Sequence, residues 1–178
     1  ITRLRSDGSA EFIAYTGNGA KGVNQGVEVE TVLQATDRLQ LTASIGLLDA
    51  EFEDYVNGSG EDLDGRDQAQ APGYQFYLAA DYRFTQALGL NISIEGKDDY
   101  YFSDGHAEQS PSYALFSSAL RYSRDNWELS LWGRNLGDKD YFLRGFSFPN
   151  DPRDGYTATR WTQLGAPRQF GMTAKTSF

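Results

Sequence analysis

The sequence lacks any long hydrophobic run: no stretch of its 178 residues approaches the roughly 18 consecutive apolar residues of a membrane-spanning helix. A helical membrane protein is therefore excluded. The mean hydropathy of -0.56 does not exclude a membrane β-barrel, because only every second residue of a membrane strand faces lipid. Basic residues are also scarce, with 16 Lys and Arg against 25 Asp and Glu. The net charge of -9 argues against a nucleic-acid partner, which would need a basic face.

Cysteine is absent, and histidine occurs only once. The lack of cysteine indicates no compartment, because it fits a cell-envelope protein and a cytosolic protein equally well. The one histidine, His106, shares a loop with Asp104, Ser110 and Ser112, but no nucleophile-elbow pattern is present. An outer-membrane hydrolase is therefore the weakest hypothesis. We predict no enzyme activity, no catalytic residue, no cofactor and no metal site.

An initiator methionine and a secretory leader are missing as well, because the chain begins Ile1-Thr2-Arg3. Either processing removed the beginning or the sequence is the C-terminal part of a longer polypeptide. The number of strands favours the second interpretation, and we expect it.

Strict alternation of side chains is the main feature that is present. Residues 166–178 carry one set of side chains, largely apolar, at every second position and another set between them, which is the period of a half-exposed strand. The first set is Phe170, Met172, Ala174, Thr176 and Phe178. Such a strand with an aromatic last residue resembles the closing strand of bacterial outer-membrane β-barrels, although a soluble sandwich can also end this way.

The same alternation predicts about eight strands, at residues 1–5, 11–33, 39–47, 74–84, 88–95, 113–123, 127–134 and 166–178. We expect short turns near residues 35, 86 and 125, and longer connections over 54–70, 103–112 and 139–164. An up-and-down barrel with short periplasmic turns and long outer loops has this asymmetry. We therefore predict an all-β fold of antiparallel strands that form a transmembrane β-barrel.

The aromatic residues agree with this fold. Tyr74 and Phe84 lie ten residues apart on one face, a rise of roughly 25 Å, which matches the apolar band of a barrel. The expected lower girdle is Tyr122, Trp127 and Phe178, and Tyr100, Phe102 and Phe52 belong to the upper girdle or project beyond it. The alternative, aromatics that fill a soluble core, does not explain why they lie at strand ends.

Alternation also predicts which side chains face the lumen. The outward set is Leu41, Ile45, Leu78, Ile92, Leu129 and Met172, and the inward set is Gln40, Ser44, Asp81, Asn91, Glu128 and Lys175. Charges avoid lipid, at a cost of about 2 to 4 kcal/mol for Lys or Arg at the midplane, so the remaining strand charges should also face inward. These further charges are Glu28, Glu30, Arg83, Glu95, Lys97, Arg121 and Arg134.

Several short motifs occur in a characteristic order: GVEVE at 26–30, LDAEFEDY at 48–55, AP at 71–72, NLGDKDY at 135–141, GAPR at 165–168 and a terminal Phe. Each motif is weak alone. In this order and spacing, the sequence resembles the C-terminal part of the β-barrel of TonB-dependent outer-membrane receptors over nearly all of residues 1–178. The motifs themselves are interpreted as structural: Asn135 predicts a strand-end turn, and Pro167 is tolerated near the start of a strand.

The resemblance implies a barrel of roughly 22 strands, of which this chain supplies the last eight or so. It implies uptake of a scarce nutrient, such as a ferric siderophore, across the outer membrane of a Gram-negative bacterium. It also implies three partners: membrane lipid, the assembly machinery, and the TonB complex, which acts through a plug domain without a counterpart here. The alternative is a free-standing small barrel with a structural or adhesive role, for which residues 1–5 fall short of the about 9 to 11 residues of a spanning strand.

Candidate ligand contacts lie in the outer loop 139–168, where arginines alternate with aromatic residues. That composition suits an anionic, partly aromatic small molecule such as a metal chelate. The candidates are Tyr141, Arg144, Phe146, Phe148, Arg153, Tyr156, Arg160 and Trp161. The alternative is a loop folded over its own aromatics. The acidic stretch 49–67 is interpreted as a solvated loop rather than a calcium site, because the downstream bidentate Glu is missing.

The last strand carries a second expected role. Phe170, Met172 and Phe178 resemble the C-terminal signal that the outer-membrane assembly machinery reads.

Overall fold

The computed structural model describes residues 2–4, 6–7, 10–12, 21–58, 60–148 and 151–177. The described part is built from antiparallel strands with one short 3-10 helix, η1 (Pro152–Asp154). No helix in these residues is long and apolar enough to cross a membrane.

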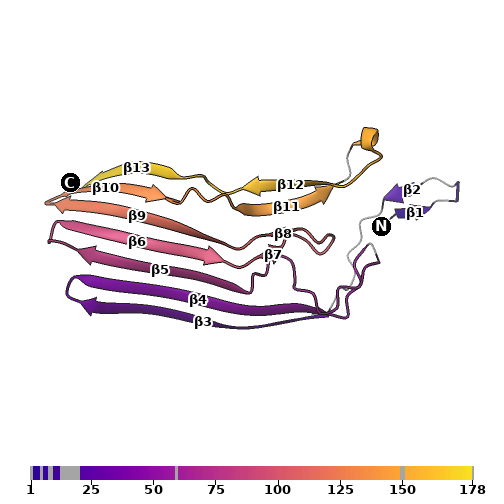
Figure 1. Cartoon of the computed structure of the whole chain (residues 1–178), viewed down its shortest axis with the longest axis horizontal. Coiled ribbons are helices and arrows are strands. Elements are labelled where there is room, and N and C mark those ends of the chain that lie inside the picture. The colour runs from indigo at the N-terminus through magenta and orange to yellow at the C-terminus, as the bar shows by residue number, and fades with distance from the viewer. Residues whose placement is uncertain are drawn as a thin grey trace.

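Seven strands form the main sheet, in the order β13-β10-β9-β6-β5-β4-β3 (Figure 1). Every neighbouring pair is antiparallel, and β3 and β13 are the two edges. The strands are β3 (Lys21–Thr36), β4 (Leu39–Glu53), β5 (Tyr74–Arg83), β6 (Leu88–Lys97), β9 (Tyr113–Arg124), β10 (Trp127–Arg134) and β13 (Gln169–Thr176). The predicted all-β, antiparallel, up-and-down fold is confirmed, and the sheet is open within the described residues.

Three short hairpins lie outside this sheet: β1 (Thr2–Leu4) with β2 (Ala10–Phe12), β7 (Tyr100–Tyr101) with β8 (Gln109–Ser110), and β11 (Phe142–Phe148) with β12 (Thr159–Leu164). The prediction of one strand over 11–33 is wrong at its beginning, because Glu11 belongs to β2 and pairs with Arg3. The predicted loops 103–112 and 139–164 also contain strands, β8 in the first and β11 and β12 in the second.

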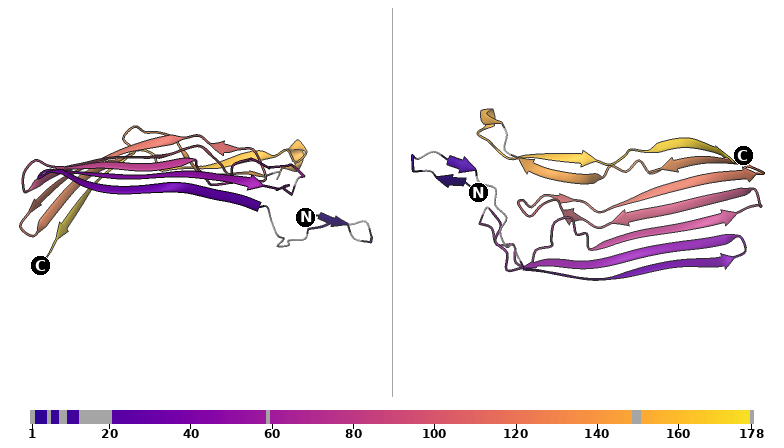
Figure 2. Two further views of the ribbon diagram at one scale, coloured as in Figure 1. Left: turned by 90° about the horizontal axis from the view of Figure 1, so that it is seen from below. Right: turned by 180° about the vertical axis from the view of Figure 1, so that it is seen from behind.

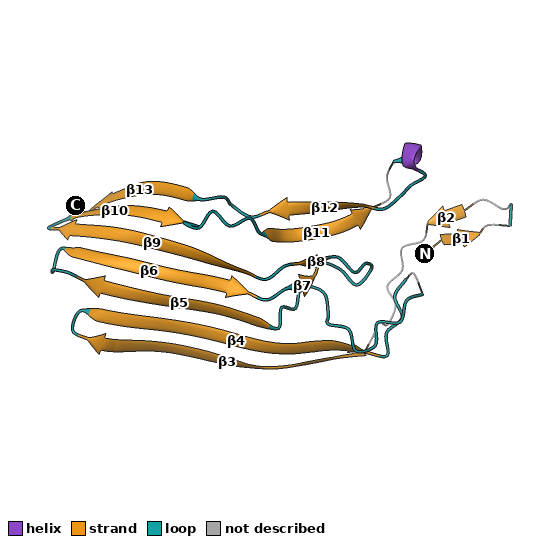
Figure 3. Cartoon of the chain, viewed as in Figure 1, coloured by secondary structure: helices purple, strands orange, loops and turns teal. Residues whose placement is uncertain are grey.

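Short turns and long connections lie at opposite ends of the sheet (Figures 1 and 2). The turns after β3, β5 and β9 share one end with the C terminus, and the long connections, drawn in teal in Figure 3 like the turns, gather at the other. The first turn lies at Asp37 and Arg38, slightly later than expected, because β3 continues to Thr36. The Thr36 hydroxyl accepts hydrogen bonds from the backbone N–H of Arg38 (3.2 Å) and Leu39 (3.0 Å). The predicted asymmetry is confirmed.

The pairing register confirms the two predicted faces. Residues opposite one another on adjacent strands share a face. Gln40 pairs with Asp81, and Asp81 pairs with Asn91. Asn91 pairs with Ala119 of β9, which in turn pairs with Trp132 of β10. Glu128 lies on the same face of β10 as Trp132 and pairs with Lys175. We call this side the polar face; it carries the whole predicted inward set. The predicted outward residues share the opposite side, the apolar face.

Burial is very uneven. On the apolar face, Tyr122 and Trp127 lie near the turn end and are 43% and 60% exposed. Phe178, the third expected member of this girdle, lies outside the described residues. The deeply buried apolar residues lie toward the loop end instead: Ala50, Leu63, Tyr100, Phe102 and Leu115. Tyr100 and Phe102 thus lie beyond the sheet, the second of the two expected placements, and both side chains are packed in a small core there rather than in the upper girdle.

Candidate functional site

A strand-end clasp joins the motifs NLGDKDY and GAPR at the loop end of β10 and β13. Asn135 has a left-handed backbone (φ 48°), which asparagine tolerates better than most residues, and its side chain is buried. Its amide donates to the carbonyl oxygens of Lys139 (2.9 Å) and Ala166 (3.1 Å), while its own oxygen accepts from the Lys139 N–H (2.9 Å). The predicted strand-end turn at Asn135 is confirmed, and one side chain fastens both motifs.

Asp138 makes the second link of this clasp. Its carboxylate accepts a hydrogen bond from the Arg168 N–H at 3.0 Å and lies 3.4 Å from the Arg168 guanidinium. The chain bends here, so that β11 and β12 continue beyond β10 and β13 as a separate hairpin (Figure 1). The motifs therefore position the hairpin that carries most of the candidate ligand contacts.

The register of the β11–β12 hairpin sorts these candidates. A bulge between Phe142 and Arg144 shifts the alternation, after which Phe146 pairs with Trp161. Arg144, Phe146, Phe148 and Trp161 consequently share one side of the hairpin, which we call the aromatic face. Phe146, Phe148 and Trp161 are 57%, 55% and 48% exposed. Four of the eight candidates thus form one exposed surface of three rings and one guanidinium.

The opposite side of the hairpin packs on the loop core. Phe142 lies 6.4 Å from Phe102 between ring centroids, in a T-shaped arrangement. A Cβ at Gly145 would lie 2.3 Å from the Phe102 ring, so only glycine fits there. Arg160 also lies on this side and forms a 2.7 Å ion pair with Glu108. Arg160 therefore holds the hairpin against the neighbouring loop and does not belong to the aromatic face.

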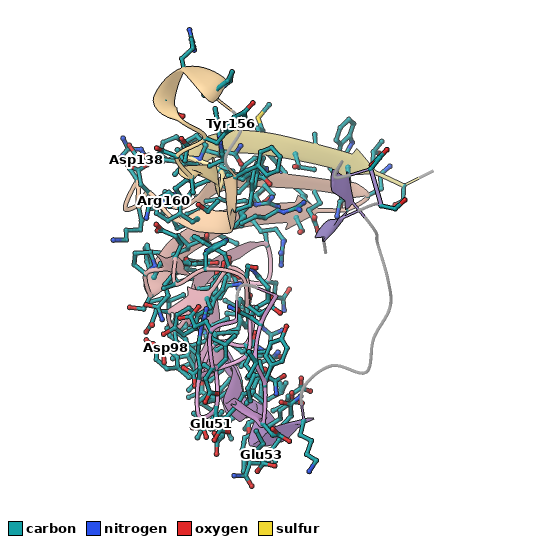
Figure 4. All side chains as sticks on the ribbon, turned by 90° about the vertical axis from the view of Figure 1, so that its right-hand side faces the viewer. Glu51, Glu53, Asp98, Asp138, Tyr156 and Arg160 are labelled. Atoms are coloured by element: carbon teal, nitrogen blue, oxygen red, sulfur yellow. The ribbon has the colours of Figure 1, made fainter. Side chains whose placement is uncertain are left out.

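Arg153 and Tyr156 lie at the tip of the hairpin. The Asp151 carboxylate accepts hydrogen bonds from Nε (2.9 Å) and Nη2 (2.7 Å) of Arg153. These bonds hold the pKa of the Asp151 carboxyl below its usual value. The same contact raises the pKa of Arg153. Tyr156 is exposed and has a left-handed backbone (φ 62°). The loop-end view in Figure 4 labels Tyr156 and Arg160 near one edge of the sheet, and Glu51 and Glu53 near the other.

Tyr141 lies apart from the other candidates, at a hollow of about 540 Å³ that also opens to the polar face. Its ring is 4.6 Å from that of Tyr113, and a Cβ at Gly165 would lie 2.0 Å from it. The charged lining residues of this hollow are Glu28, Glu30, Glu95 and Lys97. The structure thus divides the eight predicted contacts among the aromatic face, the hairpin tip, the loop core and this hollow.

Arg66 is a loop residue that was not among the predicted site residues. Its guanidinium stacks over the Tyr101 ring at 3.9 Å and donates to the carbonyl oxygens of Ser103 (2.9 Å) and His106 (2.7 Å). Tyr100 makes a similar link, because its hydroxyl lies 3.1 Å from the Phe142 carbonyl oxygen. These contacts join residues 54–70, 98–112 and 135–168 into one loop cluster. The only available signal was an isolated arginine in an acidic stretch.

The acidic stretch 49–67 stabilises its own backbone. Asp64 accepts from the Asp54 N–H and Asp62 accepts from the Asp64 N–H, both at 3.0 Å. Across the described residues, no group of three His, Cys, Asp or Glu side chains is arranged to hold a metal ion.

Comparison with known proteins gives consistent matches. The family model described as TonB dependent receptor-like, beta-barrel, matches residues 1–136. The ferrioxamine receptor of Yersinia enterocolitica is 27% identical over 131 residues, which make up 70% of this chain and 18% of that protein. This chain thus spans about a fifth of the length of that relative.

Two solved structures share the fold. The ferric yersiniabactin uptake receptor FyuA of Yersinia pestis superposes with a TM-score of 0.74 at 19% identity, over 90% of this chain and 24% of that one. The siderophore receptor PiuA of Acinetobacter baumannii superposes with a TM-score of 0.70 at 21% identity, over 87% of this chain and 22% of that one. At such identities the likeness concerns the arrangement of the strands.

Proposed function

This chain belongs to the TonB-dependent receptor β-barrel family, and on that premise we propose that residues 1–178 form part of the barrel wall of an outer-membrane receptor that takes up a ferric siderophore. The observation that carries the proposal is the separation of an apolar and a polar face across the seven neighbouring strands of the sheet. An up-and-down wall with these two faces fits between lipid and a polar lumen. The relatives named as siderophore receptors support the class of cargo.

The apolar face contacts the lipid of the outer membrane of a Gram-negative bacterium. The short turns then lie on the periplasmic side and the loop cluster lies outside the cell. The remaining strands, the plug domain and the contact with the TonB complex belong to the rest of the receptor, because this chain spans 18% of the curated relative.

The aromatic face is the proposed ligand contact. Exposed rings beside a guanidinium suit an anionic chelate with flat apolar parts, because arginine binds anions and stacks on rings. Tyr141, Arg153, Tyr156 and Arg160 flank this face and form the outer part of the proposed contact set. Among these, Arg160 acts through the position of the hairpin, since Glu108 already neutralises its charge.

The test is uptake of radioactive ferric chelates by cells whose only receptor of this class is the full-length protein. The double substitution of Phe146 and Trp161 by alanine should lower uptake of the cognate chelate by about tenfold or more, the loss typical of contacts at the centre of an interface. Leu164→Ala is the matched control, because Leu164 is also exposed but lies on the other side of the hairpin. Unchanged uptake by the double variant would contradict the proposed ligand contact.

We also propose that Phe170, Met172 and Phe178 form the signal for the assembly machinery. Phe170 and Met172 lie on the apolar face and are 72% and 65% exposed. Deletion of Phe178 removes burial worth only about 1.5 to 3 kcal/mol, too little to unfold a large barrel. A sharp fall in the heat-modifiable, membrane-inserted fraction of the deletion variant would therefore indicate a defect in assembly. Ser177→Ala is the control, and its inserted fraction should be unchanged. Equal insertion of deletion and parent would contradict the role.

A free-standing small barrel is not favoured. In the described part of the chain, the edge strands β3 and β13 pair with β4 and β10 alone, and β1 has three residues, which pair with β2.

A further inference from the structure

The charges of the polar face are sorted along the strands. Toward the loop end, the hollow beside Tyr141 has three carboxylates, Glu28, Glu30 and Glu95, against one ammonium group. Toward the turn end, a second hollow of about 430 Å³ has three guanidinium groups against the single carboxylate of Asp81. The two charged regions lie about six residues apart along β5, or roughly 20 Å.

The three arginines of the lower hollow occupy one row across the sheet. Arg83 pairs with Gly89, and Gly89 pairs with Arg121, so a residue without a side chain lies between the two guanidinium-bearing strands. Arg38 joins the same row, because its carbonyl oxygen accepts the Arg83 N–H at 2.8 Å. Strands about 4.8 Å apart put the backbones of Arg83 and Arg121 roughly 10 Å from each other. We call Arg38, Arg83 and Arg121 the arginine row.

The guanidinium groups of the arginine row are not paired with carboxylates in the described residues. Within the part of the chain that the structure describes, none of its members forms an ion pair, and the Arg83 guanidinium donates instead to the Asp37 carbonyl oxygen at 2.6 Å. Asp81 is engaged elsewhere, because its carboxylate accepts the Asn91 amide at 3.0 Å. On the same face Lys175 lies 3.5 Å from Glu128, so the wall does pair charges where a partner is available.

Three like charges in one row favour an anionic partner, because complementary charge offsets their mutual repulsion. The shape of the surface decides which kind. The row is open, spans roughly 14 Å across the strands from Arg38 to Arg121 and lies below an oppositely charged region, so an extended segment can meet several of its charges. A compact anion would contact one or two of them.

We propose that the arginine row is a docking surface for an acidic segment of the receptor polypeptide that lies inside the barrel. The inference rests on the proposed function, because a lumen exists only if this wall is part of a closed barrel. The segment carries at least two Asp or Glu side chains and belongs to the part of the receptor outside residues 1–178.

The experiment uses the full-length receptor in outer membranes, with the photo-crosslinking residue p-benzoylphenylalanine in place of Ser123, which lines the same hollow. Irradiation should link position 123 to an Asp- or Glu-rich segment of the same polypeptide, identified by mass spectrometry. The double substitution Arg83→Glu and Arg121→Glu should lower the yield of this product by about tenfold, equivalent to about 1.4 kcal/mol. Arg124→Glu is the matched control, because Arg124 belongs to the apolar side of β9 and pairs with Asp125. Its yield should stay within about twofold of the parent.

Two results would overturn the proposal while leaving the uptake function intact. One is a product with a segment that lacks carboxylates, or a yield that the double reversal does not change, in receptor that inserts normally. The other is no crosslink to the polypeptide together with binding of citrate or phosphate that the double reversal abolishes, which would make the row a small-anion site. Failure of the parent to insert in the outer membrane would contradict the proposed function itself, and the docking surface with it.

Discussion

The seven-stranded sheet, which we call the wall, and the loop cluster differ in how far their large apolar side chains are buried. On the wall, large side chains such as Val27 and Phe170 are 61% and 72% exposed on the apolar face. In the loop cluster, Leu63, Tyr100 and Phe102 are 2%, 3% and 6% exposed. Exposed apolar area of this extent is unusual on a soluble surface, and it marks a face that something else covers. The wall therefore depends on its surroundings, whereas the loop cluster makes its own core.

The comparison also explains how polar groups are satisfied. The wall pairs its backbone through ladders that run along seven strands. In the loop cluster, side chains such as Arg66, Asn135 and Tyr100 bond to the backbone of other loops. The effect of a substitution in the wall should thus depend on the face that the residue occupies. A substitution in the loop cluster should instead destabilise all three loops that it joins.

The largest expected effect is in the loop core. Phe102→Ala should cost about 3 to 5 kcal/mol locally, because it removes a buried ring that packs on Tyr100, Phe142 and Gly145. Hydrogen exchange should rise throughout residues 98–112 and 142–164, while the heat-modifiable fraction of the full-length receptor stays unchanged. The control is Phe148→Ala, whose ring is exposed. Loss of barrel insertion by Phe102→Ala alone would show that the two regions do not have separate stabilities.

A smaller effect is expected on the wall, where neighbouring positions should differ sharply. Ile92 lies on the apolar face and Ser93 on the polar face of β6. Ile92→Arg should lower the free energy of unfolding in lipid vesicles by about 2 to 4 kcal/mol, whereas Ser93→Arg should change it by about 1 kcal/mol or less. Urea titration of the full-length barrel measures both. Equal losses for the two variants would contradict the division into faces.

The clasp between the regions should give the smallest loss. Asn135→Ala removes a buried amide with three hydrogen bonds and leaves carbonyl oxygens unpaired, at a cost of about 1 to 3 kcal/mol. We expect faster proteolysis within residues 135–168 and an unchanged ladder between β9 and β10. Asn126→Ala is the comparison variant, because Asn126 is exposed and its amide donates to the Ser177 carbonyl oxygen at 2.8 Å. If residues 135–168 of Asn135→Ala resisted proteolysis as well as those of the parent, the proposed role of the clasp would be contradicted.

The two faces of the wall could be predicted from the sequence, because successive side chains of a strand point to opposite faces. Leu41, Ile45 and Leu78 face one way for the same reason that Gln40 and Asp81 face the other. The beginning of β3 could not be predicted, because the glycines at 17, 19, 22 and 26 interrupt the alternation before Val27. The motif at Asn135 predicted a turn, but its bond to Ala166 requires two segments 31 residues apart to meet.

The loop cluster was largely hidden from the sequence. The bulge between Phe142 and Arg144 breaks the alternation of β11, so the β11–β12 hairpin had no visible period. Arg66 stacks on Tyr101 only because two separate loops fold together. The predicted ligand residues were therefore a mixture: Arg144 and Trp161 share a face, whereas Arg160 belongs to the contact with Glu108. Composition identified the region, and the register was needed to divide it.

The most direct test of the account is the environment of alternate residues along β6. The chain has no cysteine of its own, so single cysteines at Ile92, Ser93, Ile94 and Glu95 in a cysteine-free receptor can each carry one fluorophore. In vesicles with spin-labelled lipid, we predict strong quenching at 92 and 94 and little at 93 and 95. Quenching without alternation, or with the opposite alternation, would contradict the claim that these strands form a wall between lipid and lumen.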